Sequence, residues 1–494
     1  MQNITFITGS NNIHLYYWKC IEQILMELPH VQITIYSNEK YQYNEVFTFN
    51  KWIDYLDSKF SNFKLNPLQK VDIQQKTNEY QQIKIKTHFK DLNQSDWIVF
   101  EKPWLDVSAF SKYTKNGFLA LNIHYLENIK AVLNNIPSVF SVLYRTSTSQ
   151  NWNNIETVQF NTEIGIKNNT HKITFNAAIY VLKFLKNQEN IKRDASEKLQ
   201  NFASKYHINL SLKLKIIFYY LGLCFKILCR KLSSQQLNWK LAIKKNDIVT
   251  FIKQPIKSFW ADPFIINDPN GNTVIYFEEL KKDGLGKISC IVLNENLEIT
   301  QKEDILNTTY HLSFPNVFSV DKQYYMIPES SQNNTLQLYK CTKFPFQWEF
   351  QHHVMEHIKL LDAVWIYHNN LYWIFANKIE DFEYDNNEKL YAYYANDLFS
   401  TNWQPHSKNP IVTDASLARN AGNFLFENNQ LYRVSQNCKN GYGKNLVFNE
   451  VKLLSTTEYV EVKVNEHMPP NKFVGMHTLN KNNNLEVFDV LTLE

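Results

Sequence analysis

The second half of this 494-residue chain contains a repeated pattern, which restricts the fold more than any other feature of the sequence. Each copy has a polar residue or pair, an apolar run of strand length, a turn and a second, aromatic-rich run. The five copies begin at Asp262, Phe314, Asp362, Asn420 and Gly475. A spacing of about fifty residues is typical of four-stranded β-propeller blades, whereas an open sandwich would explain the short strands but not the period. We therefore predict a five-bladed β-propeller over residues 241–494.

The residues in front of the first strand of each copy define a candidate site. In a propeller the innermost strand of each blade starts near the central channel, so these residues should meet around one axis. Two acids, two histidines and an arginine are too polar for a packed core and indicate a ligand site. The alternative is that the groups pair with one another, Asp362 with Arg419 for example, and fill the channel. The residues are Asp262, His311, Ser313, Asp362, Arg419, Asn420 and His477.

Four further residues complete the predicted sugar-binding set. Trp260 and Trp365 are expected to give a sugar ring a stacking surface, while acids accept hydrogen bonds from its hydroxyl groups. Glu278 in the run YFEE and Glu329 in the run MIPES are the other two. We predict no metal at this site.

The motifs of this half resemble those of two groups of propellers. The series WADPF, YFEE, HLSFPNVF, MIPES, DAVW, RNAG, YRVSQNC and HTLN resembles the propeller domain at the N-terminus of plant glucosamine inositolphosphorylceramide transferases and in bacterial surface-polysaccharide proteins. WADPF followed by an aromatic strand also resembles the first blade of glycosidases of the arabinanase and levansucrase type.

The glycosidase resemblance implies catalytic roles for two acids. In that group the Asp of the first blade is a general base or nucleophile, which corresponds to Asp262. The acid of the second blade is missing, because FPNVF has Pro315 and Asn316 at the expected position. Glycosidases usually carry their general acid on the third blade, where this chain has Asp362. Chemistry by paired carboxylates would then use Asp262 with Asp362, or with Glu329.

The N-terminal half has the pattern of an α/β domain, which we place at residues 1–190. ITFITGS, the helical stretch HLYYWKCIEQILMEL and VQITIYS give β-α-β order and predict a parallel sheet with covering helices. Further on, the buried strand WIVF, a short helix SAFSKYT and the strand FLALNIH lead to Asn122 and His124. Alternation along a strand puts these two side chains on one face, at the carboxyl end where catalytic residues commonly lie.

The run from Ser95 to His124 resembles the formyltransferase fold, which includes methionyl-tRNA and nucleotide-sugar N-formyltransferases. The resemblance implies that Asn122 holds the developing oxyanion and that His124 manages the proton of the attacking amine. Glu163 stands where the family has an Asp that orients the His, and Asn161 is a competing match. The implied cofactor is 10-formyltetrahydrofolate, with an amino-sugar as acceptor. The alternative is a formyltransferase-like scaffold without activity.

Residues 191–240 are predicted to form a helical, basic connection between the two domains. Within residues 208–232 the run LSLKLKIIFYYLGLCFKILCRKL is too short and too charged to span a bilayer. Its lysines surround aromatic residues, so this helix either lies on an anionic membrane, which would suit a lipid-linked glycan substrate, or packs between the domains with its lysines outward.

Charge, cysteines and the first residues restrict partners and location. A net charge of +4 gives no basic field that would favour nucleic acid. The six cysteines are scattered without zinc-ligand spacing and are expected to be reduced thiols. The beginning MQNITFITGS lacks the pattern of a signal peptide. We expect a cytoplasmic protein, with peripheral contact at the inner face of the membrane if the basic helix binds lipid.

These patterns together predict a multidomain protein with an N-terminal Rossmann-like α/β domain and an all-β propeller. The leading interpretation is a carbohydrate-active enzyme of bacterial surface-polysaccharide biosynthesis, which transfers a formyl group to an amino-sugar and holds a sugar or nucleotide-sugar on its propeller. One alternative is a propeller-centred glycosyl transferase or glycosidase with a vestigial formyltransferase-like domain. Another is a non-catalytic carbohydrate-binding scaffold.

Overall fold

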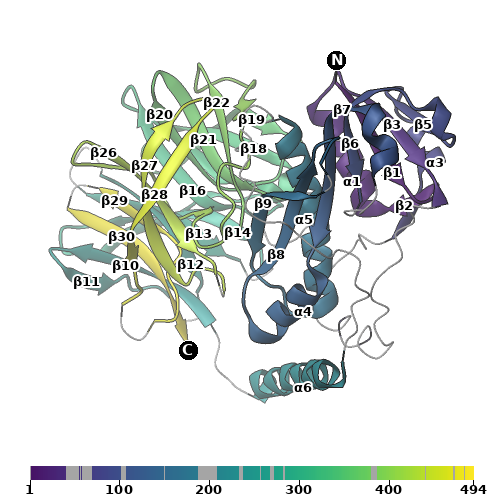
Figure 1. Ribbon diagram of the computed structural model, residues 1–494. Helices are drawn as coiled ribbons and strands as arrows, with labels where there is room; N and C mark the ends of the chain where they lie inside the picture. The colour runs from purple at the N-terminus through teal and green to yellow at the C-terminus, as the bar shows by residue number, and fades with distance from the viewer. Residues whose placement is uncertain are drawn as a thin grey trace. The chain divides into compact units, whose positions relative to one another are not determined.

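The computed structural model divides into two compact units, Met1–Lys231 and Leu232–Glu494 (Figure 1). The structure describes residues 2–39, 55, 57, 69–101, 107–149, 151–186, 209–232, 237–255, 258–267, 272–281, 284–379, 387–439, 441–470, 473–482 and 484–493. Residues 191–208 of the predicted helical connection therefore lie outside the described residues.

The first unit contains a mixed, mostly parallel seven-stranded sheet in the order β5-β3-β1-β6-β7-β8-β9. Its strands are β1 (Asn3–Thr8), β3 (Gln32–Ser37), β5 (Ile83–Lys86), β6 (Ser95–Phe100), β7 (Thr114–Ile123), β8 (Ser138–Arg145) and β9 (Asn153–Phe160). The first five pair in parallel, whereas β8 runs antiparallel to both β7 and β9. The mostly parallel α/β sheet predicted from the β-α-β pattern is confirmed, and the formyltransferase assignment stays a prediction.

Helices and a short ribbon complete the first unit. The helices are α1 (Leu15–Glu27), α3 (Ile73–Thr77), α4 (Tyr125–Asn134), α5 (Ile166–Lys186) and α6 (Leu210–Leu232), with 3-10 turns η2 (Phe89–Asp91) and η3 (Ser108–Tyr113). Strands β2 (Asn12–His14) and β4 (Lys70–Asp72) pair as a separate ribbon. The apolar run of β6 is buried at the centre of the sheet, because elements cover both of its faces. None of the helices within the described residues is long and apolar enough to cross a membrane.

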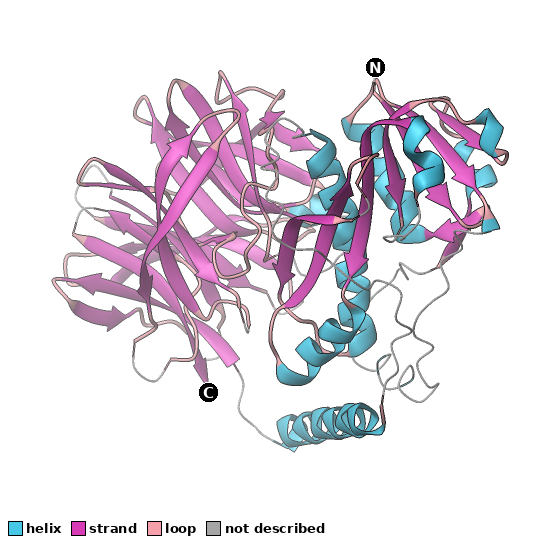
Figure 2. Ribbon diagram, in the orientation of Figure 1, coloured by secondary structure: helices cyan, strands magenta, loops and turns pink. Residues whose placement is uncertain are grey.

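The second unit is a five-bladed propeller, shown in Figure 2 as strands joined by loops. Blade 1 has β12 (Trp260–Asn267), β13 (Thr273–Leu280), β14 (Gly286–Leu293) and β15 (Ile299–Leu306), and blade 2 has β16 (Ser313–Val320), β17 (Gln323–Glu329), β18 (Thr335–Lys343) and β19 (Gln347–Glu356). Blade 3 has β20 (Leu360–His368), β21 (Leu371–Lys378), β22 (Leu390–Ala395) and β23 (Gln404–Pro405). In blade 4, β24 (Arg419–Asn420) and β25 (Leu425–Glu427) both pair with β26 (Gln430–Asn437), followed by β27 (Asn445–Leu454) and β28 (Tyr459–His467). The propeller predicted from the repeat is confirmed.

Blade 5 closes the ring with strands from both ends of the unit. Its inner strands β29 (Leu479–Asn482) and β30 (Leu485–Leu493) come from the end of the chain, whereas β10 (Leu237–Lys245) and β11 (Ile248–Phe251) come from the beginning of the unit. β10 pairs with β30 in unbroken antiparallel register from Leu237–Leu493 to Lys245–Leu485. The last sequence copy has room for only two strands, and this pairing supplies the other two.

The innermost strands of the blades face one axis. β12 packs against both β16 and β29, β16 packs against β20, and β20 packs against β24. Apolar clusters fill the spaces between neighbouring blades; one of them joins Trp260, Phe277 and Val487. The sheets therefore form the rigid walls of the propeller, and the start of each innermost strand is positioned at its centre.

Candidate functional site

The innermost strands of blades 1 to 3 share a β-bulge at the axis. In each bulge one residue has a positive φ: 52° at Asp262, 43° at Phe314 and 47° at Asp362. This left-handed conformation is uncommon for residues with a side chain, so its recurrence at matching places shows that the blade architecture imposes it. The sequence copies already align Phe314 with Asp262 and Asp362. Ser313, predicted as a ligand contact in front of this strand, lies opposite Glu329 as Ala261 lies opposite Glu278.

The second strand of each blade carries another polar residue, which pairs with the innermost strand of the same blade at the axis. The register pairs Ala261 with Glu278, Ser313 with Glu329, Leu361 with Asn377 and Arg419 with Gln436. In blade 5 the amide of Asp489 donates to the carbonyl of Thr478 at 3.3 Å, which puts Asp489 at the matching place. We call these five residues the second ring: Glu278, Glu329, Asn377, Gln436 and Asp489. All five are buried.

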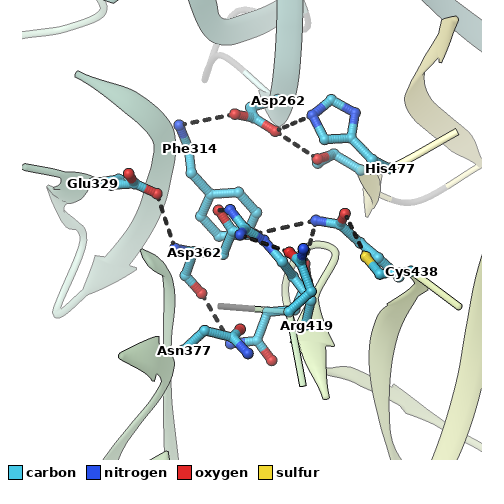
Figure 3. Close-up of polar contacts among 12 residues, drawn as sticks. Asp262, Phe314, Glu329, Asp362, Asn377, Arg419, Cys438 and His477 are labelled. Carbon is cyan, nitrogen blue, oxygen red and sulfur yellow. Dashed lines mark hydrogen bonds and ion pairs between the residues drawn. The ribbon is translucent and has the colours of Figure 1, made fainter. Parts of the chain in front are cut away.

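His477 lies between the carboxylates of Asp262 and Asp489; Figure 3 shows its contact with Asp262. The imidazole Nε2 lies 3.1 Å from Asp262 Oδ1, and Nδ1 lies 2.7 Å from Asp489 Oδ2. Asp262 also accepts hydrogen bonds from the Thr478 hydroxyl at 2.7 Å and from the Phe314 amide at 3.2 Å. Asp489 accepts from the amides of Asp262, His477 and Thr478, each at 3.0 Å. Two carboxylates and one imidazole thus tie blades 1, 2 and 5 together.

The charges of this cluster are fixed by its geometry. Burial alone would lower the pKa of His477, but the two adjacent carboxylates raise it well above its ordinary value. Burial alone would raise the pKa of Asp262, but His477 and the hydrogen bonds that Asp262 accepts hold it below its ordinary value. The cluster therefore contains an imidazolium beside the ionised carboxylate of Asp262 at neutral pH.

Asp362 and Arg419 form a second buried pair. The guanidinium donates from Nε to Asp362 Oδ2 at 2.6 Å and from Nη2 to Oδ1 at 3.2 Å, and Gln436 Nε2 donates to Oδ2 at 3.1 Å. Asn420 donates to the carbonyls of Asp362 and Phe375, both at 2.9 Å. Burial raises the pKa of Asp362 against the opposing charge of Arg419. The pairing of Asp362 with Arg419, considered from the sequence as an alternative to a ligand site, is thus present.

Glu329 is the acid of the site that retains its proton. Its Oε2 accepts from the Asp362 amide at 3.2 Å (Figure 3). Its Oε1 accepts from the Ser331 hydroxyl at 3.0 Å. Burial and the negative charge of Asp362 raise the pKa of Glu329 to about 8. At neutral pH this side chain is a neutral carboxylic acid, which is the form able to donate a proton.

Glu278 and His311 form a third pair closer to solvent. His311 Nε2 lies 3.2 Å from Glu278 Oε1, and its Nδ1 accepts from the amide of Gly286 at 2.9 Å. Burial raises the pKa of Glu278, and the charge of His311 opposes this. Burial alone would lower the pKa of His311, but the carboxylate of Glu278 raises it. His311 lies in the loop before β16 and is only partly buried, so it can contact a ligand.

The aromatic residues of the site differ from those predicted. Trp260 is buried in the cluster between blades 1 and 5, and Trp365 packs on Phe318 with ring centroids 4.4 Å apart. Neither offers a free ring face to a sugar, because each is used in packing between blades. Tyr442 takes this place: it is 44% exposed and lies over the Arg419 guanidinium at 5.2 Å and beside the His477 ring at 5.3 Å.

Asp262, His477 and Asp489 also offer ligand atoms for a cation, all within 4.8 Å of one another. The direct contacts of His477 with both carboxylates at 2.7 and 3.1 Å fill the space between these atoms. In the structure these three residues therefore pair with one another as an ion-paired network.

The sequence analysis identified the polar residues in front of the innermost strands, but it missed most of the second ring. Asp489, Gln436, Asn377, Thr478 and Tyr442 were absent from the predicted set. A signal existed for the first three: the second run of each copy ends in a polar residue, as in YFEE, IPES, FANK, SQN and VFD. Aligning the copies on their second strands would have located the second ring. Tyr442 lies in a loop outside the repeat and gave no such signal.

The predicted N-terminal residues lie at the carboxyl end of β7. Asn122 Nδ2 lies 3.3 Å from His124 Nε2, and the same nitrogen of His124 lies 2.9 Å from the Ser141 hydroxyl. Glu163 is 3.2 Å from the buried Lys172 Nζ, which also donates to the Asn161 carbonyl at 3.0 Å. Glu163 thus forms an ion pair with Lys172, and the Ser141 hydroxyl lies beside His124; the orienting role of Glu163 stays a prediction.

The propeller is distantly related to plant proteins. A family model described as "Glucosamine inositolphosphorylceramide transferase 1, N-terminal" matches residues 246–490, just under half of the chain. The Arabidopsis thaliana protein named glucosamine inositolphosphorylceramide transferase 1 is 32% identical over 219 residues, which cover 42% of this chain and 27% of that protein. The protein of the same name from Oryza sativa subsp. japonica is 30% identical over 220 residues, which cover 42% and 28%. The match thus spans little more than a quarter of the length of these relatives.

Solved structures of glycoside hydrolases also align with the chain. A thermostable family-43 glycoside hydrolase aligns at 11% identity with a TM-score of 0.35, covering 48% of this chain and 89% of that chain. The Cellvibrio cellulosa alpha-L-arabinanase complexed with arabinohexaose aligns at 12% identity with a TM-score of 0.32, covering 41% and 77%.

Proposed function

We propose that the protein is a carbohydrate-active transferase and that the axis of its propeller binds the sugar. The observation that carries this proposal is the set of buried charged groups around one axis, inside the segment that the transferase family model covers. Buried charges cost free energy unless they are paired, so a fold that keeps three ion pairs at its centre uses them for more than packing.

The rim of the axis has the groups that a sugar requires. Hydrogen bonds to Asp362 and Asn387 already fix the Arg419 side chain, so sugar binding would not lose side-chain entropy by ordering it. His311 lies partly exposed at the edge of blade 2, and the exposed ring of Tyr442 provides the apolar face on which a sugar ring stacks. A neutral Glu329 would supply a proton to a departing oxygen, and the ionised Asp262 would stabilise positive charge on the sugar.

Transfer is favoured over hydrolysis by the state of the carboxylates. Hydrolysis by paired carboxylates needs one group free to act as base or nucleophile. Asp362 is held by both nitrogens of Arg419, and Asp262 already accepts from Thr478 and Phe314. The name of the plant relatives includes glucosamine and inositolphosphorylceramide. For this chain we propose only the corresponding classes of substrate: an amino-sugar or nucleotide-sugar as donor and a lipid-linked molecule as acceptor.

A calorimetric titration of the full chain with glucosamine, N-acetylglucosamine and UDP-N-acetylglucosamine tests this proposal. Tyr442→Ala should weaken binding about tenfold, because a stacking contact is lost. The matched control is Tyr367→Ala, whose ring is 53% exposed on β20. Equal effects of the two substitutions, or no binding of any of these sugars, would contradict the proposal and leave the charged axis as a structural element.

Formyl transfer at Asn122 and His124 is a second candidate function, favoured by their mutual contact at the carboxyl end of β7. The cofactor would be 10-formyltetrahydrofolate, whose formyl carbon the amine of an amino-sugar attacks. His124→Ala should abolish the production of N-formyl sugar while folate binding persists. Glu163→Gln should act through stability, since it removes the partner of the buried Lys172. A protein that neither binds a folate nor forms an N-formyl product would exclude this function.

A further inference from the structure

Helix α6 has two apolar faces. Among the described residues, one face packs against the first unit and the other is exposed. On the covered face, Ile216 and Tyr220 pack against α4 and the start of α5. The Tyr220 hydroxyl donates to Asp57 Oδ1 at 2.7 Å and accepts from the Ile166 amide at 3.1 Å. These contacts fix the orientation of the helix about its own axis.

The opposite face presents an apolar stripe to solvent. The exposed fractions are 46% for Leu214, 69% for Phe218, 54% for Leu221, 66% for Phe225 and 55% for Leu228. The spacing of four, three, four and three residues keeps all five on one line along a helix of 3.6 residues per turn. Exposed large apolar residues scattered singly need no explanation, but a continuous stripe on one helix marks an interaction surface.

Lysines border this stripe on both sides. With 3.6 residues per turn, Lys215 and Lys226 lie on one flank and Lys213 on the other, and all three are exposed. The sequence has no acidic residue between Glu197 and Asp247, a stretch that includes the whole of α6. An apolar stripe flanked by lysines is the arrangement in which side chains enter the acyl region while ammonium groups reach anionic headgroups.

A second copy of the chain fits this face poorly. Two helices that paired along the stripe would bring their flanking lysines together, because coiled-coil partners meet at those positions. Each helix carries lysines and no acids there, so the pairs would repel. An anionic lipid bilayer offers acyl chains to the apolar stripe and negatively charged headgroups to the flanking lysines.

We propose that α6 docks the protein on the surface of an anionic lipid bilayer, with the stripe Leu214, Phe218, Leu221, Phe225 and Leu228 inserted and the helix in the plane of the membrane. Lysines interrupt the apolar run of α6, so this helix is not apolar enough to span a bilayer and lies in the interface. This proposal rests on α6 alone and does not depend on the sugar site of the propeller.

Co-sedimentation of the full chain with vesicles tests it. Wild-type protein should bind phosphatidylcholine vesicles containing about one third phosphatidylglycerol, and binding should weaken with salt and with pure phosphatidylcholine. Phe218→Glu with Phe225→Glu should lower the binding constant at least tenfold. Phe426→Glu, whose ring is 71% exposed on β25 of the propeller, is the matched control and should bind as wild type does. The thermal midpoint of the double variant should stay unchanged, because both positions face solvent.

A second variant tests the charge contribution separately. Replacing Lys213, Lys215 and Lys226 by Gln should weaken binding to the anionic vesicles about fivefold per lysine, with no change for neutral vesicles. The proposal is overturned if wild-type protein fails to bind anionic vesicles, or if neither variant changes the binding. It is also overturned if sedimentation without lipid shows a dimer that Phe218→Glu with Phe225→Glu dissociates, since the stripe would then bind a second copy.

Discussion

At the scale of single residues, the proton on Glu329 is the most informative property of the axis. The pKa of Glu329 in the folded propeller is raised to about 8, from an ordinary 4.5. Between these two values the folded state keeps a proton that the unfolded chain has lost. The free energy of unfolding must therefore fall as pH rises across this range, with a limiting slope of about 1.4 kcal/mol per pH unit.

Glu329→Gln should remove this slope, because an amide stays neutral at every pH and can still accept from the Asp362 amide. We expect the variant to gain stability relative to wild type between pH 5 and pH 8, while the two stay close at pH 5. Denaturant unfolding of the propeller at several pH values measures the difference. Subtraction cancels most of the titration of His311 and His477, which both proteins share. A constant difference at all pH values would show that Glu329 is ionised throughout.

The structure also changes what a substitution of Asp262 should do. The sequence indicates a carboxylate placed for a ligand, whose removal leaves the fold intact. In the structure Asp262 holds a buried imidazolium, so Asp262→Asn should destabilise the propeller by about 3–5 kcal/mol. Asp321→Asn is the matched control, since Asp321 has a similar φ of 49° but is exposed in a turn, and it should change stability by less than about 0.5 kcal/mol. Equal unfolding midpoints for the two variants would refute the ion pair.

At the scale of elements, the repeat of strands could be predicted because each copy shows its own pattern of apolar, polar and turn residues. The register between strands could not be predicted, because it depends on how separate strands pair. Period and alternation located all five copies. Each bulge inserts one extra residue into the innermost strand. This extra residue changes which side chain points to the axis. Aligning the copies placed Phe314 at the position of Asp262, but it did not reveal the bulge that gives both residues a positive φ. A β-bulge leaves no composition signal, so an isolated copy does not reveal it.

Closure of the ring by β10 and β30 is the second feature that depends on long-range pairing. These strands are separated by almost the whole propeller, yet they share a continuous register. Phe488→Ala on β30 should cost about 3–5 kcal/mol of propeller stability, because this ring is buried between blades 4 and 5. Leu493→Ala on the same strand, where the side chain is 54% exposed, is the control and should have little effect. Chemical denaturation monitored by tryptophan fluorescence distinguishes the two, and similar losses would show that the closing strand is not packed as described.

At the scale of the whole molecule, the first unit and the propeller differ in how far apart in the sequence their paired strands lie. The propeller is a ring in which each blade is stabilised by its neighbours, so it folds only when the first and last strands meet. The α/β sheet of the first unit is built from neighbouring parallel strands with short-range crossovers. The sequence predicted both architectures, because each has its own hydrophobic period. It did not predict the partners of Glu163 or of Trp260, because those depend on tertiary packing.

The last prediction follows from where the residues of the axis come from. Both polar levels lie between Asp262 and Asp489, and both closing strands, β10 and β30, lie after residue 236. A fragment of residues 232–494 therefore contains every blade and every group of the candidate site. We expect this fragment to unfold in one cooperative transition and to bind the same sugars as the full chain within about twofold, since every described residue of the candidate site lies within it. Calorimetric titration of fragment and full chain side by side measures this. A fragment that folds but binds more than about tenfold more weakly would show that the first unit contributes to sugar binding, and one that fails to fold would show that the ring needs the first unit to close.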